Sequence, residues 1–199
     1  MPPRTANPSA RQTELLEAAY EYVLVHGLTD LSLRPLAEAV GSSTRVLMFL
    51  FGNKDGLVRA LLERARADEL VLLAGLREPE RPVGLVDAAA QVWTWLAADR
   101  HRPLLRLWAE AYARSLVEPD GPWAGFARNT VDDWLDVLAD CQPRAERDSE
   151  EGAIRRTLTL ATLRGALLDL LATDDESRLT AAVHRHLALL RGADRDSTS

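Results

Sequence analysis

The residues with the clearest capacity for chemistry lie close together between Ser42 and Lys54. Arg45 carries a guanidinium group that can donate two hydrogen bonds to O6 and N7 of a guanine, and Thr44 can contact a thymine methyl group or a phosphate. Phe49 can either touch a thymine methyl group or pack against its neighbours. Side chains of these types, closely spaced along a short helix, are typical of proteins that read base edges in DNA.

Contacts to phosphates would come from the ends of the same helices. Lys54 stands at a predicted helix start, where its ammonium group and the free backbone N–H groups can hold a phosphate together. Ser32 and Ser43 can reach phosphates, or they can simply cap helices with their hydroxyl groups. Alternatively, Arg45 and Lys54 are ordinary solvated charges on the protein surface that do not contact DNA. The candidate DNA-binding residues are Ser32, Ser42, Ser43, Thr44, Arg45, Met48, Phe49 and Lys54.

A helix-turn-helix unit must position these side chains. The stretch from Ser32 to Leu57 predicts two short helices and the start of a third, because apolar residues recur at helical spacing. Gly41 ends the first helix, since glycine adopts left-handed backbone angles without a steric penalty. Ser43 caps the second helix, and Asn53 caps the third. The second helix of such a unit enters the major groove of DNA.

This stretch resembles the DNA-binding signature of the TetR family of bacterial transcriptional regulators. The matching positions are spread over both short helices, the glycine turn and the start of the next helix. They are Ser32, Leu33, Arg34, Leu36, Ala37, Val40, Gly41, Ser43, Leu47, Phe51, Lys54 and Leu57. The detailed match covers roughly residues 11 to 62, and the remainder is similar only as an all-helical domain.

The sequence departs from the family pattern at three places. Pro35 replaces the usual acidic residue, and Leu50 stands where His or Tyr is common. Met48 and Phe49 occupy the two positions at one of which a Tyr is expected, so the phosphate contact of a Tyr hydroxyl group is missing. The resemblance implies a symmetric dimer built through the last two helices, and a regulator that an effector releases from DNA.

Composition limits the class of protein. The chain has 199 residues, of which 47% are hydrophobic, and this is ample for a core. The single Cys141 excludes an internal disulfide and is typical of a reducing cytoplasm. The sequence predicts no transmembrane span and no apolar signal segment. The net charge is −6, but residues 1–66 hold eight basic and seven acidic side chains, so the acidic excess lies elsewhere and the N-terminal part can still face DNA.

The rest of the chain predicts helices and no strand. The expected fold is all-α with about nine helices: a three-helix DNA-binding domain over residues 1–54 and a helical effector-binding and dimerisation domain over residues 55–199. A break is expected at residues 78–82 and a polar linker at 143–149. The further predicted helices are Ser9–His26, Lys54–Leu76, Gly84–Asp99, Pro103–Val117, Trp123–Asp140, Glu150–Thr173 and a last helix that Asp174 or Asp175 caps and that runs through Leu190.

No set of residues predicts catalysis, a metal site or a cofactor. No glycine-rich phosphate loop is present, and His184 and His186 lie two apart on a helix and therefore face different ways. The aromatic residues of the body either fill a core or line an apolar cavity for a ligand. Arg164 is either a cation in that cavity or an ion-paired interface residue. The candidate ligand-binding residues are Trp93, Trp108, Tyr112, Phe126, Trp134 and Arg164.

Two functional interpretations follow. The first is a cytoplasmic, homodimeric regulator, most simply a repressor, that binds a palindromic operator in double-stranded DNA and is released by a small apolar or aromatic effector. Its dimer surface would be the last two helices, where Gly165 and Ala166 permit close approach. The second is an all-helical small-molecule binding protein or enzyme that kept the fold without specific DNA binding. The motif favours the first interpretation, and the net charge and missing Tyr favour the second.

Overall fold

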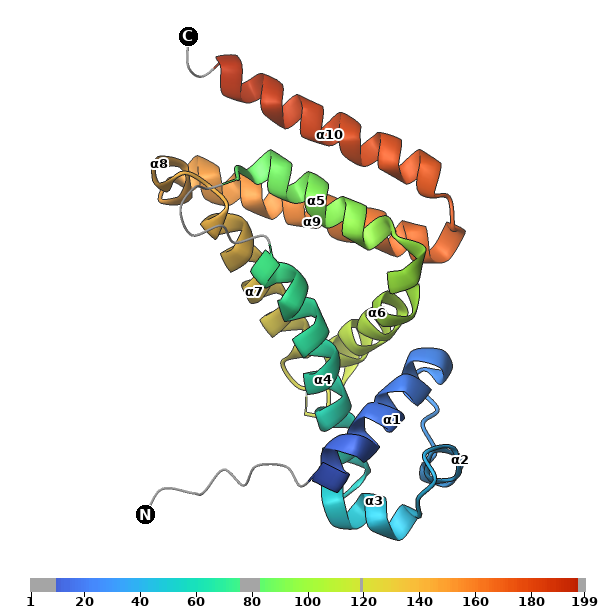
Figure 1. The fold of residues 1–199 in the computed structure, drawn as a ribbon. Coiled ribbons are helices and arrows are strands. Elements are labelled where there is room, and N and C mark those ends of the chain that lie inside the picture. The colour runs from blue at the N-terminus through green and yellow to red at the C-terminus, as the bar shows by residue number, and fades with distance from the viewer. Residues whose placement is uncertain (1–9, 76–82, 119, 197–199) are drawn as a thin grey trace, which may run out of the picture. The chain divides into compact units, whose positions relative to one another are not determined.

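The protein is built from helices throughout the part of the chain that the structure describes. The computed structural model describes residues 10–75, 83–118 and 120–196, which form ten α-helices, one 3-10 helix and no strand (Figure 1). No helix in these ranges has the length and apolar character needed to cross a bilayer. The predicted all-α fold is confirmed. The helices are α1 (Ala10–His26), α2 (Leu33–Ala39), α3 (Thr44–Phe51), α4 (Lys54–Gly75), α5 (Leu85–Ala97), η1 (Asp99–His101), α6 (Arg102–Val117), α7 (Phe126–Asp140), α8 (Arg144–Arg147), α9 (Glu150–Thr173) and α10 (Glu176–Asp196).

The helices form two compact units. The first unit comprises Met1–Asp68 with Leu107–Phe126, and the second comprises Glu69–Arg106 with Ala127–Ser199. The divisions between the units therefore fall within α4, α6 and α7. The break predicted at residues 78–82 lies outside the described residues.

The first unit has its core between α1, α2 and α3, which pack in sequence order. Leu15, Ala19 and Val23 recur at four-residue spacing along α1, so they lie on one face of that helix. Leu36 of α2 and Leu47 of α3 complete the core, and all five side chains are at most 1% exposed. The apolar stripe of each short helix thus faces inward and leaves the opposite side of α3 outside.

The turn between α2 and α3 has the predicted structure. Gly41 has a φ of 61°, a left-handed conformation that favours glycine, and the N–H of Ser42 donates to the carbonyl oxygen of Ala37 at 2.8 Å. Ser43 precedes α3, and its hydroxyl oxygen accepts a hydrogen bond from the N–H of Val46 at 3.3 Å. These local bonds set the direction in which α3 leaves the turn.

Two further caps were predicted, and one of them differs in the structure. Asn53 caps α4, since its side-chain oxygen accepts a hydrogen bond from the N–H of Gly56 at 2.7 Å. Ser32 stands at the N-cap position of α2, but its side chain makes no capping hydrogen bond, so the predicted hydroxyl cap is wrong. The Ser32 carbonyl oxygen still accepts from the N–H of Leu36 at 3.2 Å, which starts the helix through the backbone alone.

The second unit is organised around α5, α9 and α10, which lie side by side (Figure 1). The inner side of α9 is formed by Leu163, Leu167 and Leu170, all of them buried. Trp93 of α5 is 1% exposed, and its indole N–H donates to the hydroxyl oxygen of Thr180 in α10 at 2.9 Å. This bond satisfies the one polar atom of a large buried ring and ties α5 to α10.

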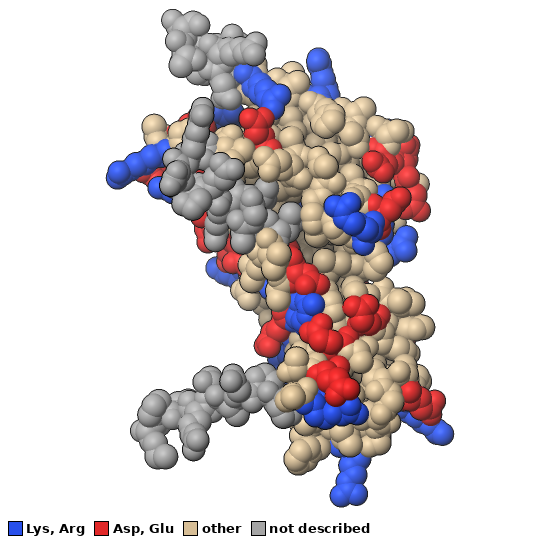
Figure 2. Space-filling view, in the orientation of Figure 1, with Lys and Arg blue, Asp and Glu red and all other residues tan. Residues whose placement is uncertain are grey.

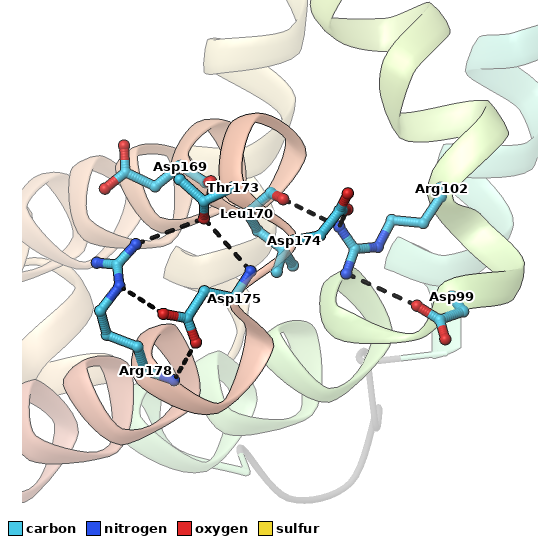
Figure 3. A network of polar contacts seen from close by, with 8 residues as sticks. All are labelled: Asp99, Arg102, Asp169, Leu170, Thr173, Asp174, Asp175 and Arg178. Atoms are coloured by element: carbon cyan, nitrogen blue, oxygen red, sulfur yellow. Dashed lines mark hydrogen bonds and ion pairs between the residues drawn. The ribbon is translucent and has the colours of Figure 1, made fainter.

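A polar network closes the C-terminal end of α9 (Figure 3). Arg102 is buried, and it donates a hydrogen bond to the carbonyl oxygen of Leu170 at 3.2 Å. Its guanidinium group also lies 3.4 Å from the carboxylate of Asp174 and 3.7 Å from that of Asp99. A cation at this place offsets the partial negative charge of the last carbonyl groups of α9.

The chain turns from α9 into α10 next to this network. Asp174 has a left-handed φ of 53°, which ends α9. Asp175 caps α10, because its carboxylate accepts a hydrogen bond from the N–H of Arg178 at 3.2 Å. That backbone bond, with the bonds from the side chains of Arg178 and Ser177, holds the pKa of Asp175 below its ordinary value. Of the two caps that the sequence predicts, the structure therefore selects Asp175.

Three other boundaries differ from the predictions. The expected linker at 143–149 contains the short helix α8, where the carbonyl oxygen of Pro143 accepts hydrogen bonds from the N–H groups of both Glu146 and Arg147. The helix expected from Trp123 begins at Phe126, because Gly125 has a φ of 75° and interrupts the helical backbone. The last helix continues to Asp196 rather than ending at Leu190.

We predict that Gly56→Ala destabilises the protein. An added Cβ at Gly56 would lie 2.1 Å from the carbonyl oxygen of Phe51, so α4 or the end of α3 would have to move. Overpacking of this kind costs about 1–3 kcal/mol. Urea unfolding measures the change in the free energy of unfolding.

The matched control is Gly192→Ala. Nothing lies within 4 Å of a Cβ added at Gly192 in α10, so this variant should be neutral or gain up to about 1 kcal/mol from better helix propensity. Equal stabilities of the two variants would show that the backbone near Gly56 yields without cost.

Candidate nucleic-acid interface

The outward side of α3 presents the side chains that the sequence analysis singled out for base contacts. Thr44, Arg45 and Phe49 are exposed on this helix. Phe49 is 85% exposed, the highest value for a large hydrophobic side chain among the described residues. Leu47 points into the core and anchors the opposite side of the helix. Phe49 therefore does not pack within the first unit, which was the alternative to contact with DNA.

The other candidate residues surround this helix. Ser32, Ser43 and Lys54 are exposed, whereas Ser42 and Met48 are half-buried. All of them belong to the first unit, in the turn before α3, within α3, or at the starts of α2 and α4. The structure thus brings the predicted DNA-binding residues together around one short helix.

The charge around α3 permits an approach by an anion. The helix has no acidic residue, and basic side chains project from the surface over α2 and α3, at the lower edge of Figure 2, with some carboxylates nearby. The exposed pair of Arg34 and Glu38 on α2 is 3.5 Å apart. Such a pair contributes little free energy, so its arginine can exchange the carboxylate for a phosphate at small cost.

A cluster of polar side chains ties α1 to α4 in the first unit. The hydroxyl of Tyr20 donates to the carboxylate of Asp68 at 2.8 Å, and Arg64 donates to Glu17 at 2.7 Å and also contacts Asp68. The guanidinium of Arg64 lies 4.7 Å from the centre of the Tyr20 ring. These contacts fix α4, and hence Lys54 at its start, relative to α1.

Ionisation of this cluster follows its contacts. Burial raises the pKa of Tyr20 well above its ordinary value, and the hydrogen bond to Asp68 raises it further, so the phenol is protonated at neutral pH. Hydrogen bonds to Glu17 and Asp68 raise the pKa of Arg64. Tyr20 therefore stays a hydrogen-bond donor and Arg64 stays charged at neutral pH.

Glu110 of α6 holds the loop between α1 and α2. Its carboxylate accepts hydrogen bonds from the N–H of Leu28 at 3.0 and 3.1 Å, and the hydroxyl of Thr29 donates to it as well. Gly27, just before this loop, has a φ of 76°. This role of Glu110 could not be predicted from the sequence, because 82 positions separate it from Leu28 and no local pattern indicates that the two residues meet.

The aromatic candidates fall into both units. In the first unit, Trp108 and Tyr112 are in tilted ring contact with their centres 5.0 Å apart, and Phe126 is half-buried. The indole nitrogen Nε1 of Trp108 is buried and has no hydrogen-bond partner among the described residues. A buried N–H group without a partner destabilises the folded protein. A bound ligand that accepts this hydrogen bond would offset that cost, and its binding would be favoured accordingly.

The second unit holds the remaining candidates. Trp93 is buried and bonded to Thr180, and the indole N–H of Trp134 donates to the carboxylate of Glu69. Arg164 is half-buried on α9. In the described ranges, no group of three or more His, Cys, Asp or Glu side chains is arranged to hold a metal ion.

The comparisons with known proteins agree on the fold. A TetR transcription regulator from Haloarcula marismortui ATCC 43049 is 15% identical with a TM-score of 0.71, over 91% of this chain and 98% of that one. SmeT, the repressor of the Stenotrophomonas maltophilia multidrug efflux pump SmeDEF, is 18% identical with a TM-score of 0.68, over 94% and 91%. The multidrug binding protein EbrR, complexed with proflavin, is 24% identical with a TM-score of 0.62, over 88% and 98%.

No protein-family model matches the chain, and no curated protein matches it in sequence. The likeness is therefore one of structure. The chain has the fold of the TetR-family transcriptional regulators: a helix-turn-helix unit followed by a larger set of helices. The resemblance that the motif indicated is confirmed at the level of the fold.

Proposed function

We propose that this protein is a ligand-responsive, DNA-binding transcriptional regulator that acts as a dimer, in its simplest form a repressor of a palindromic operator. The observation that carries the proposal is the outward side of α3, where Arg45 and Phe49 are exposed on a helix-turn-helix. Residues 1–54 would contact DNA, and residues 55–199 would bind the effector and the second protomer. Such a regulator works in the cytoplasm, which suits a chain whose one cysteine is Cys141.

Each DNA-contacting residue has a distinct role in this proposal. Arg45 donates to a guanine edge, and Thr44 contacts the same groove. Lys54 and the free N–H groups at the start of α4 hold a phosphate. Ser32 and Ser43 can reach phosphates of the DNA backbone, and the half-buried Ser42 and Met48 complete the contact surface around α3.

We predict that selection from random duplex DNA enriches a near-palindrome with half-sites about 34–36 Å apart or a multiple of that spacing. Arg45→Ala should cost about 1–3 kcal/mol on this site and relax the preference at one base pair, because the guanine contact is lost. Lys54→Ala should weaken binding to all sequences alike and flatten the salt dependence, since it removes a phosphate contact.

Arg128→Ala serves as the control, because Arg128 is an exposed arginine on α7 paired with Asp132. Its affinity for DNA should equal that of the unaltered protein. If selection returns no enriched sequence, the regulator proposal fails, and the alternative is an all-helical small-molecule binding protein or enzyme with this fold.

The exposed face of α9 supports the dimer. Ile154, Leu158 and Leu168 are exposed apolar side chains at helical spacing, and Gly165 lies on the same face. Nothing lies within 4 Å of a Cβ added at Gly165, so the space over this residue is open within one protomer. A second copy could approach closely there, with α10 contributing Leu189, which is also exposed.

We predict a dimer by analytical ultracentrifugation at micromolar concentration, and a weaker one for Gly165→Trp. The Cβ of the new side chain meets nothing within the protomer, and circular dichroism establishes that the variant is folded, so a weaker dimer reports on the contact between copies. Asn129→Trp, at an exposed position of α7, is the volume-matched control and should leave the dimer unchanged. A monomeric unaltered protein would contradict this part of the proposal.

We further propose that an apolar or aromatic effector binds in the first unit, where Trp108, Tyr112 and Phe126 lie. The other candidates, Trp93, Trp134 and Arg164, belong to the second unit and stay predicted ligand contacts there. Trp108 is the best supported, because its buried indole N–H lacks a partner in the described structure. EbrR, which shares the fold, is complexed with proflavin, an aromatic molecule. Proflavin is therefore a sensible first probe.

We predict that an effector quenches tryptophan fluorescence and lowers the affinity of the protein for DNA. By thermodynamic linkage, DNA must lower the affinity for the effector by the same factor. Coupling free energies of about 1–3 kcal/mol are typical. Trp108→Phe keeps an aromatic ring and removes the N–H, so it should weaken an effector that accepts this bond by about 0.5–1.5 kcal/mol. Trp95→Phe is the control, because Trp95 is not one of the proposed effector-binding residues, and it should leave effector affinity unchanged. If every quenching ligand leaves DNA affinity unchanged, these aromatic residues serve the core.

A further inference from the structure

The exposure of the Phe49 side chain contributes nothing to the stability of the fold. It is 85% exposed on a helix whose buried side chain, Leu47, already anchors it to the core. An exposed phenylalanine forgoes the free energy that burial of its ring would supply. Contiguous exposed apolar patches, unlike single apolar side chains, mark places where another molecule binds.

The neighbours of Phe49 on α3 define what it could bind. Successive residues of a helix are rotated by about 100°, so Phe49 lies about 40° from Arg45 and about 60° from Val46 around the axis. Val46 is also exposed, at 38%. Around the helix axis, Phe49 therefore lies between Arg45 and Val46, and it is about 6 Å along the axis from Arg45. The exposed face thus places the guanidinium group of Arg45 beside an apolar strip formed by Phe49 and Val46.

This combination fits the major-groove edges of DNA. The groove offers hydrogen-bond acceptors on guanine and one apolar group, the 5-methyl of thymine. A phenylalanine can satisfy no hydrogen bond, so among these groups the methyl is the one it complements. Base pairs are stacked 3.4 Å apart along each strand, so a separation of about 6 Å places the two contacts one or two base pairs apart.

We propose that Phe49, with Val46 beside it, determines specificity by reading a pyrimidine 5-methyl group one or two base pairs from the guanine bound by Arg45. This inference rests on the proposed DNA-binding function and deepens it. The occupant of this apolar strip is thus duplex DNA rather than a second protein. Charge supports that choice, because α3 carries Arg45 and no acidic residue, and Lys54 is exposed at the start of the next helix.

The test uses the full chain and the best duplex from random-sequence selection. Each thymine is replaced in turn by uracil, which keeps the hydrogen-bonding edge and lacks the methyl group. We expect one position in each half-site at which affinity falls about fourfold, the factor that corresponds to burial of one methyl-sized group. At the same position, 5-methylcytosine should bind about fourfold more tightly than cytosine.

Two variants separate the contacts. Phe49→Ala should bind the thymine and uracil duplexes equally while it keeps the guanine preference. Arg45→Ala should lose the guanine preference and keep the discrimination between thymine and uracil. Circular dichroism and thermal unfolding establish that both variants are folded, as expected for changes at exposed positions.

The outcomes distinguish this inference from the proposed function. If sequence-specific binding persists and no uracil substitution lowers affinity, the methyl-reading role is wrong and the regulator proposal stands. The role is also wrong if Phe49→Ala keeps the full discrimination, or if it changes the oligomeric state and leaves DNA binding unaltered, which would assign the strip to a protein contact. If no specific DNA binding occurs at all, the proposed function itself fails.

Discussion

The orientation of α3 depends on contacts at its two ends and on a single buried side chain. A helix of eight residues is too short to be stable alone, so its position must come from outside it. Ser43 caps its start, Leu47 anchors its inner face, and its last carbonyl group, that of Phe51, approaches α4 so closely at Gly56 that only glycine fits. These constraints together decide which side chains face outward.

Long-range polar contacts hold the remainder of the first unit around that helix. Tyr20 and Arg64 join α1 to α4, and Glu110 holds the loop between α1 and α2. Each contact involves a charged or strongly polar group whose partners restrict its geometry more than apolar packing does. A change in the position of α6 near Glu110 would therefore move the loop that leads into α2.

Phe49 and Trp108 break local rules in complementary ways. Phe49 exposes an apolar ring, and Trp108 buries an N–H group for which the described residues offer no acceptor. Folded proteins concentrate such conflicts where they bind other molecules, since the partner supplies the missing contact. These two residues are accordingly the centres of the proposed DNA and effector contacts, and both proposals rest on chemistry that the folded chain leaves unsatisfied.

The sequence by itself determined the elements whose signals are local. Gly41, Ser43 and Asn53 act on backbone groups within a few residues, so the helix-turn-helix and the caps of α3 and α4 could be predicted, as could the bounds of α9. Only the tertiary structure decided that Phe49 is exposed and that Glu110 meets Leu28. Exposure and long-range pairing depend on how helices pack, and distant residues come together only when the apolar faces of several helices are buried at once.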